Sequence, residues 1–141
     1  MIRLFLDANV LFTAAHNPRG KASLVIDLGR RGHWQMATSA FAVEEARRNL
    51  ARKYPQCLEA FERTVADLLL VDPGPMGDCP LDLPKKDQPI FLAARRGAAT
   101  HLLTGDLRHF GAAMNVPAQT GGILIQTVAD FLSDLASVPD S

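Results

Sequence analysis

The feature that most constrains this chain is the alternation of short apolar runs with longer amphipathic segments along nearly its whole length. The short runs, bounded by turn residues and typical of buried strands, lie at residues 2–6, 33–39, 66–72, 99–106 and 121–126. Segments with helical spacing lie between and after them, at residues 21–31, 40–54, 56–66, 88–98 and 127–136. Strands that alternate with helices indicate a parallel sheet with helices on both faces. We therefore predict an α/β fold, a three-layer α/β/α sandwich whose central parallel sheet has about four to five strands.

The length and composition fit one compact domain. The 141 residues are about the size of an ordinary domain, and no internal repeat or linker divides them. With 48% hydrophobic and 21% charged residues, the composition excludes a disordered chain. We predict a single domain over residues 1–141, with a core at about 2–132 and a frayed tail at 137–141. Residues 73–86 contain four prolines and two glycines, which predicts a long irregular loop.

Charge and cysteine content narrow the class of protein further. The 15 Lys and Arg residues balance the 15 Asp and Glu residues, which argues against a histone-like nucleic-acid binder. Cys57 and Cys79 lie apart with no CxxC motif, which makes a disulfide scaffold or a structural zinc site unfavourable and indicates a reducing compartment. Arg3 and Asp7 interrupt the N-terminal apolar run, and no stretch reaches the roughly 20 apolar residues of a membrane helix. We expect a cytoplasmic protein.

Acidic residues follow several of the predicted strands. In an open parallel sheet, ligands bind beyond the carboxyl ends of the strands. Asp7 directly follows the first strand and Asp106 follows the fourth, while Asp87 begins the helix after the proline-rich loop. Glu44 and Glu45 lie near the start of helix 40–54. Four carboxylates from four separate segments can thus converge on one edge of the sheet.

Each of these acids also has a purely structural explanation, because Asp forms turns and helix caps and Glu is favoured near a helix start. A cluster is different. Neighbouring carboxylates repel each other by roughly a few kcal/mol per close pair at an effective dielectric constant near 20, so their convergence requires a cation. Sites made of oxygen ligands suit hard divalent ions such as Mg²⁺ or Mn²⁺. The pattern therefore predicts a divalent-metal site.

Four short motifs follow one another along the chain. They are DANVLF after the first strand, VEEARRNL on a helix, LPKKDQPIFLAA at the start of another helix and LLTGDLRHF after a strand. In this order they resemble the PIN-domain ribonucleases over about residues 2–132. The spacing from PRGKAS through TGDLRHF to ADFL is most similar to the bacterial branch that forms the toxin component of toxin–antitoxin pairs.

The resemblance implies a Mg²⁺- or Mn²⁺-dependent endonuclease that holds one or two ions and uses metal-assisted hydrolysis. Carried over by position, the catalytic and metal-binding acids are Asp7, Glu45, Asp87 and Asp106. Glu45 fits the family register because Ala46 and Leu50 follow it at the family spacing. Glu44 remains the alternative, since both glutamates lie about 130° from the apolar centre of the helix.

Further residues are expected to support the acids. Asn9, two residues after Asp7, can hydrogen-bond that carboxylate or form a local turn instead. Ser39 and Thr104 stand where family members often have a hydroxyl group near the acids, and either can also bond only to backbone. His109 is the histidine nearest the site, and we expect it to pack or to cap a helix rather than to catalyse.

A polyanionic substrate that approaches an acidic edge needs basic side chains around it. Lys85, Lys86 and Arg108 are the main RNA-binding candidates because they flank proposed metal ligands. The other candidates, each of which can equally be a solvated or ion-paired side chain, are Arg19, Lys21, Arg47, Arg48, Arg52 and Lys53.

The leading interpretation is an endoribonuclease that acts as a toxin. The resemblance also implies an antitoxin protein as partner and a homodimer. Two alternatives remain: a structure-specific DNA nuclease, and a PIN-like module that has lost its chemistry and serves as a binding partner. That all four acid positions are filled favours an active enzyme over the silent module.

Overall fold

The computed structural model of this chain describes residues 1–72, 74 and 79–137. A five-stranded sheet lies at its centre, with all neighbouring strands parallel and with the order β3-β2-β1-β4-β5. The strands are β1 (Arg3–Leu6), β2 (Gln35–Thr38), β3 (Leu69–Leu70), β4 (His101–Leu103) and β5 (Leu124–Gln126). The predicted α/β fold with a central parallel sheet is confirmed.

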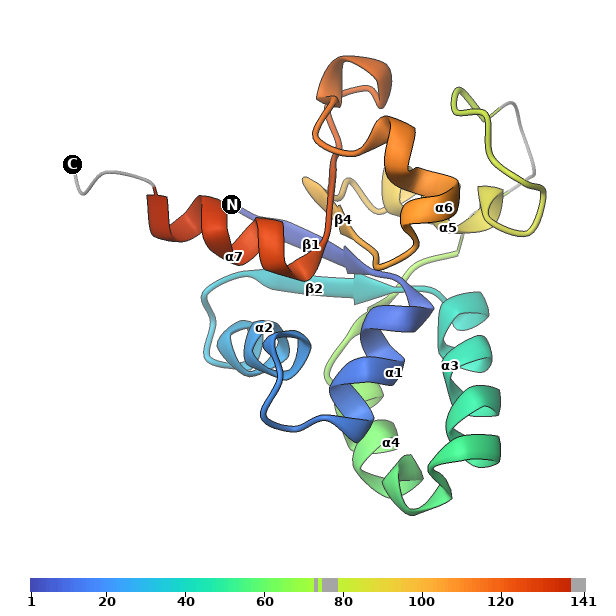
Figure 1. Cartoon of the computed structure of the whole chain (residues 1–141), viewed down its shortest axis with the longest axis vertical. Coiled ribbons are helices and arrows are strands. Elements are labelled where there is room, and N and C mark those ends of the chain that lie inside the picture. Colours follow the sequence, from blue (N-terminus) through green and yellow to red (C-terminus); the bar gives the residue numbers. More distant parts are fainter. Residues whose placement is uncertain (73, 75–78, 138–141) are drawn as a thin grey trace.

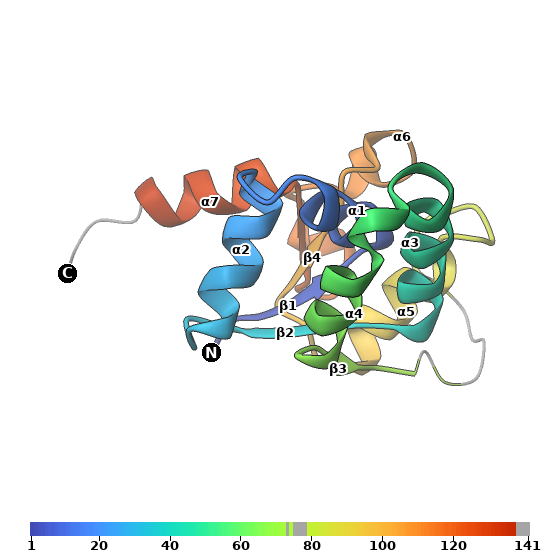
Figure 2. The same ribbon diagram turned by 90° about the horizontal axis from the view of Figure 1, so that it is seen from below.

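Helices cover both sides of this sheet (Figure 1). They are α1 (Ala8–His16), α2 (Lys21–Arg30), α3 (Ala40–Lys53), α4 (Leu58–Ala66), α5 (Gln88–Arg96), α6 (Leu107–Phe110) and α7 (Val128–Ser137). In the view of Figure 1, α1, α2 and α4 lie below the sheet and α5 and α6 above it. Helix α7 packs against α2 and crosses one end of it, as Figure 2 shows, and its Phe131 packs edge-on against Trp34 at 5.1 Å between ring centroids.

The core is built around the central strand. Leu4, Phe5 and Leu6 of β1 are fully buried, because helices cover both faces of a strand in the middle of a parallel sheet. The edge strand β3 differs, since Leu69 and Leu70 are about half exposed. The predicted strand at 66–72 is therefore too long: its first residue still belongs to α4, and only two residues pair with β2.

Two parts of the chain have helices where the sequence predicted none. Helix α1 begins directly after β1, because the Asp7 carboxylate accepts a hydrogen bond from the backbone N–H of Ala8 and caps the helix. The second part follows β4, where α6 and the short 3₁₀ turns Gly111–Ala113 and Pro117–Gln119 lie. The described residues of the predicted loop, 74 and 79–86, contain no helix or strand.

The sheet has its topological switch point between β1 and β4. From β1 the chain continues to β2 on one side, and it later returns to β4 on the other side. Leu6 pairs with Leu103, so both strands end at the same level and place Asp7 and Thr104 at one edge. In a sheet of this kind, the crevice between two such strands is where ligands bind.

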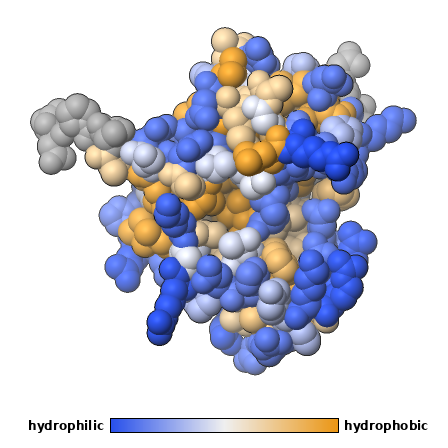
Figure 3. Space-filling model, in the orientation of Figure 1, coloured by the Kyte–Doolittle hydropathy of each residue, from blue (hydrophilic) through white to orange (hydrophobic). Residues whose placement is uncertain are grey.

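Polar and apolar surfaces are unevenly distributed over the molecule. In the view of Figure 3, hydrophilic side chains cover α3 and α4, whereas apolar side chains gather between α2 and α7. None of the helices in the described ranges combines the length and apolar character needed to cross a membrane. The expected frayed tail falls mostly on residues 138–141, which lie outside the described residues, and Ser137 still belongs to α7.

Candidate active site

The four predicted acids line one cavity at the carboxyl ends of β1 and β4. The cavity has a volume of about 220 Å³. Its lining residues are Asp7, Ala8, Asn9, Phe12, Glu45, Asn49, Lys86, Asp87 and Asp106. The acids come from the β1–α1 junction, from α3, from the start of α5 and from the β4–α6 junction. The fold therefore brings together side chains from four separate parts of the chain.

A larger cavity of about 550 Å³ lies elsewhere, between α2 and the starts of β1 and β2. Its charged groups already have partners within the chain. Asp67 lies 3.0 Å from the guanidinium of Arg30, and Arg3 donates a hydrogen bond of 2.6 Å to the carbonyl of Gly97. The smaller cavity is the better candidate for chemistry, because it is there that carboxylates face each other.

Asp7 is the most deeply buried of the four acids, with 5% of its surface exposed. One carboxylate oxygen accepts from the backbone N–H of Ala8 at 2.7 Å, and the other accepts from the Thr104 hydroxyl at 2.8 Å. Burial raises the pKa of Asp7 to about 6, against the lowering effect of these two hydrogen bonds, and the charges of Glu45 and Asp87 raise this pKa further. Without a cation, the carboxylate of Asp7 is costly to ionise.

A small network of hydrogen bonds holds Asp7 and connects β1 to β4. The amide oxygen of Asn9 accepts from the backbone N–H of Gly105 at 2.7 Å, and its amide nitrogen lies 3.4 Å from Asp7 and 3.3 Å from Thr104. The buried Thr104 hydroxyl also accepts from the backbone N–H of Asp106 at 3.1 Å. Asn9 and Thr104 thus lie beside the acids, as expected from their sequence positions.

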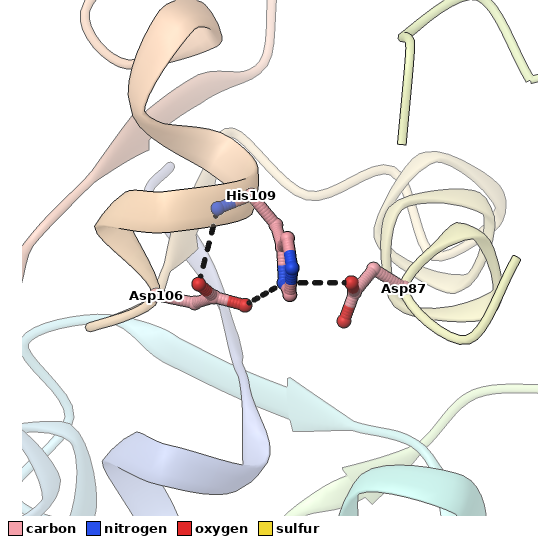
Figure 4. A group of neighbouring side chains, drawn as sticks. All are labelled: Asp87, Asp106 and His109. Carbon is pink, nitrogen blue, oxygen red and sulfur yellow. Dashed lines mark hydrogen bonds and ion pairs between the residues drawn. The ribbon is translucent and has the colours of Figure 1, made fainter. Parts of the chain in front are cut away.

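Asp87, Asp106 and His109 form a compact group in which the imidazole ring lies between two carboxylates (Figure 4). Nδ1 of His109 is 2.8 Å from Oδ2 of Asp106 and 3.0 Å from Oδ2 of Asp87. Burial raises the pKa of Asp87, and the charge of Asp106 acts in the same direction, whereas His109 and Lys86 lower it. The two aspartates of this group line the cavity, and His109 lies behind them.

The two neighbouring glutamates of α3 point in different directions. Glu45 lines the cavity, and its charge contributes to the raised pKa of Asp7. Glu44 is not among the lining residues; it is exposed and lies 2.8 Å from the guanidinium of Arg47. Ser39 is buried and accepts from the backbone N–H of Ala42 at 3.2 Å, which makes it the N-cap of α3. Its contact is therefore with backbone, and it starts the helix that carries Glu45.

The basic candidates divide by position. Lys86 lines the cavity, whereas Lys85 and Arg108 are exposed residues next to it in sequence. Arg47 contacts both Glu44 and Glu62 and is less available to a substrate. Of the other candidates, Arg52 contacts Asn49 and Lys53 lies over the Phe12 ring. The exposed residues Arg19, Lys21 and Arg48 have no polar side-chain partner within the described part of the chain.

Sequence reasoning did not include two residues that line the cavity, Phe12 and Asn49. It placed His109 near the site but expected it to pack or to cap a helix, whereas the structure groups its ring with Asp87 and Asp106. Phe12 was missed because helix α1 itself was not predicted. Asn49 lies one helical turn after Glu45, and His109 lies one turn after Asp106. Residues three or four positions apart share a helix face, so this spacing was the available signal.

The chain does not satisfy all of its own carboxylate oxygens at this site. An imidazole nitrogen carries at most one hydrogen, which it can donate to only one of the two aspartates at a time. Oδ2 of Asp87 is buried and has no hydrogen bond among the described residues. Four converging carboxylates with such an unsatisfied oxygen fit a hard divalent ion that binds oxygen ligands.

Comparisons with known proteins identify the family of the chain and relatives of its fold. A model of the PIN domain family matches residues 3–108. No curated protein matches the chain. The fold is similar to the crystal structure of VapBC2 from Rickettsia felis bound to a DNA fragment from their promoter, with 14% identity, a TM-score of 0.63, and coverage of 89% of this chain and 98% of that one. It is also similar to VapBC-1 from nontypeable Haemophilus influenzae, with 13% identity, a TM-score of 0.56, and coverage of 91% and 99%.

Proposed function

The chain belongs to the PIN-domain family, and on this premise we propose that it is a divalent-metal-dependent endoribonuclease that acts as the toxin of a toxin–antitoxin pair. The observation that carries the proposal is the convergence of Asp7, Glu45, Asp87 and Asp106 on one cavity. Neither a structural cap nor a turn requires four carboxylates from separate segments to face each other. Their mutual repulsion is offset when a cation binds between them.

In this proposal the four carboxylates hold one or two Mg²⁺ or Mn²⁺ ions. When bound, such ions would lower the pKa of a water molecule that attacks the phosphate and would offset the charge that develops on the scissile phosphate. The chain's own contribution is to fix the ligands. Thr104 and the backbone N–H of Ala8 orient the Asp7 carboxylate. The side chain of Asn9 accepts a hydrogen bond from the backbone N–H of Gly105 and so connects the β1 and β4 ends of the sheet. Ser39 caps α3 and so fixes the helix that presents Glu45.

Basic residues around the cavity would hold the RNA backbone. Lys86 lies at the cavity itself, and Lys85 and Arg108 are exposed next to Asp87 and Asp106 in sequence. They would contact phosphates, so they contribute affinity rather than sequence selectivity. The formal net charge of zero becomes +2 when one divalent ion binds, which further favours a polyanion.

The proposed partner is an antitoxin protein, and the proposed assembly is a homodimer of this chain. The antitoxin is supported by the motif resemblance to toxin components and by the fold likeness to VapBC2 and VapBC-1. The homodimer rests on the motif resemblance alone. The two cysteines are free thiols, which fits the cytoplasm as the compartment in which such a pair would act.

The test is a metal-dependent cleavage assay. Mn²⁺ is titrated into the purified protein and into an Asp7→Asn/Asp106→Asn variant, with structured RNA and DNA of the same sequence as substrates. We expect the wild type to cut RNA only, and the variant to lose this activity. The matched control is Asp27→Asn/Asp67→Asn, which removes two exposed acids near Arg30, far from the cavity lining, and should leave cleavage unchanged.

Other outcomes would redirect the proposal. Equal residual cutting by the wild type and the cavity variant would place the activity elsewhere. Cutting of DNA instead of RNA would support the structure-specific DNA nuclease. A wild-type protein that cuts neither polymer with Mn²⁺ or Mg²⁺ would favour a binding module that has lost its chemistry.

A further inference from the structure

We propose that His109 supplies a nitrogen ligand to a divalent ion held by Asp87 and Asp106, and that this ligand makes the site prefer Mn²⁺ over Mg²⁺. The inference rests on the proposed function, because it assumes that the cavity binds a cation. It adds a ligand that the acid motifs do not include, and it specifies which ion the site selects.

The distances suit three ligands of one ion. Two ligands at right angles on an octahedral ion, each with a bond of about 2.1 Å, lie about 3 Å apart. Nδ1 of His109 lies 2.8 Å from the Asp106 oxygen and 3.0 Å from the Asp87 oxygen. The three ligand atoms all lie within 4.8 Å of one another. A shared ion therefore requires little rearrangement of these side chains.

The local structure holds His109 in this position. Asp106 is the N-cap of α6, and its Oδ1 accepts from the backbone N–H of His109 at 3.1 Å. The same carboxylate thus fixes the residue through one oxygen and faces its ring through the other. The ring nitrogen directed at the aspartates is Nδ1, which leaves Nε2 to carry the hydrogen of a neutral, ligating imidazole.

The second observation concerns the carboxylate of Asp87, one oxygen of which the chain leaves without a donor. Oδ2 of Asp87 is buried and has no hydrogen bond among the described residues, although Nδ1 of His109 lies nearby. Unsatisfied buried carboxylate oxygens are costly. An ion bound to Nδ1 and to both Oδ2 atoms would satisfy all three at once.

The identity of the donor atoms sets the metal preference. Mg²⁺ favours oxygen ligands and retains its waters, whereas the later divalent ions accept imidazole increasingly well along the series that begins with Mn²⁺. A site of carboxylates alone gives little discrimination between Mg²⁺ and Mn²⁺. One imidazole in the same site strengthens Mn²⁺ binding more than Mg²⁺ binding.

The decisive measurement is pulsed electron paramagnetic resonance of Mn²⁺ bound to the full-length protein, which detects a nitrogen in direct contact with the ion. We expect a ¹⁴N coupling in the wild type that changes to a ¹⁵N coupling when histidine is labelled with ¹⁵N, and that is lost in His109→Asn and His109→Ala. The control is His33→Gln, an exposed histidine that is not among the residues lining the cavity, which should retain the coupling.

Affinity provides a second readout that does not depend on catalysis. The Kd for Mn²⁺, measured by titration of the free-ion signal, should rise about tenfold in both variants, while the Kd for Mg²⁺, measured by competition, should change less than about twofold. In His109→Asn the amide oxygen stands near the former Nδ1 position, so this variant should bind Mg²⁺ at least as well as His109→Ala does.

Three outcomes would overturn the inference. Wild type that binds Mn²⁺ without any nitrogen coupling would remove His109 from the ligands and leave the proposed nuclease function intact. An equal loss of Mn²⁺ and Mg²⁺ affinity in both variants would mean that His109 only positions Asp106. Absence of Mn²⁺ binding by the wild type would overturn this inference together with the proposed function.

Discussion

On the outer surface of α3 and α4, the carboxylates of Glu44 and Glu62 each lie 2.8 Å from the guanidinium of Arg47, so the chain neutralises these acids itself. On the cavity side of α3 the arrangement is different. Glu45 faces Asp7, whose charged form is disfavoured by burial, and the nearby group of Asp87 and Asp106 shares a single imidazole ring.

The contrast separates acids that serve stability and solubility from acids that are left available to a ligand. Exposed ion pairs contribute only about 0–1 kcal/mol each, but they leave no charge uncompensated. Buried carboxylates without a full set of partners destabilise the metal-free protein. The chain gives Glu44 and Glu62 an arginine partner, whereas no Lys or Arg within the described residues forms an ion pair with any of the four cavity acids. The negative charge of the cavity is therefore left for a bound cation to neutralise.

The largest expected effect comes from a cavity acid. Asp87→Asn should lower RNA cleavage by about 10²–10³-fold, because it removes a charged ligand where charge develops during the reaction. Glu62→Gln, which removes a surface acid beside Arg47, should change the rate less than about twofold. Initial rates at saturating Mn²⁺ measure both. Equal losses of cleavage rate in the two variants would show that the cavity acids and the surface acids do not differ in function.

The next effect concerns stability and has the opposite sign to the loss of activity. Because the pKa of Asp7 is raised to about 6, the metal-free folded protein holds this proton more tightly than the unfolded chain does. Stability should therefore fall as the pH rises from about 4 through about 6. Asp7→Asn lacks this titration. Its free energy of unfolding, relative to that of the wild type, should therefore rise by about 2–3 kcal/mol between about pH 4 and about pH 7.5.

Urea unfolding in the presence of a chelator at the two pH values measures this difference. Added Mn²⁺ should restore the stability of the wild type at the higher pH and should change the stability of Asp7→Asn little. A difference between the two proteins that is independent of pH would show that Asp7 does not carry the cost of ionisation.

A smaller effect distinguishes two adjacent residues of one helix. Glu45→Gln should raise the Kd for Mn²⁺ about tenfold, while Glu44→Gln should leave it unchanged, because only Glu45 lines the cavity. Calorimetric titration of both variants gives the values. The reverse result would make Glu44 the ligand and would require the start of α3 to turn when the ion binds.

The smallest effect belongs to the surface region. Arg47→Gln should lower the free energy of unfolding by about 0.5–1 kcal/mol, since Glu44 and Glu62 lose their shared partner. The loss should shrink at high salt, which screens exposed charges. Denaturant unfolding at low and high salt tests this, and Mn²⁺ affinity serves as the control that should not move.

Local patterns accounted for much of the fold. The buried strand before Asp7 and the helix that ends before Pro55 were predictable. A buried strand has a run of apolar residues, and a proline ends a helix, so both features can be read from neighbouring residues. Helix α1 was missed because Asp7 after a strand has the pattern of a turn. In the structure the same aspartate caps a helix with one oxygen and faces Thr104 with the other.

Asp106 and Asp87 show why the roles of acids are harder to predict. Asp106 caps α6 through one oxygen, although the sequence predicted no helix there, and its second oxygen lies beside His109. Asp87 occupies the N-cap position of α5 and makes no side-chain cap bond, so its carboxylate is turned toward the imidazole instead. In sequence, Asp7 and Asp106 have the appearance of turn residues after a strand and Asp87 that of a residue at the start of a helix, and neither pattern shows what each carboxylate faces.

The sequence by itself therefore determined the kinds and order of the elements, the edge of the sheet at which acids gather, and the family to which the chain belongs. These depend on short-range patterns of burial, capping and spacing. Only the tertiary structure decided that Glu45 rather than Glu44 faces the cavity, and that His109 lies between two aspartates. Both depend on how helices distant in sequence pack against each other, which sets side-chain directions that no local pattern contains.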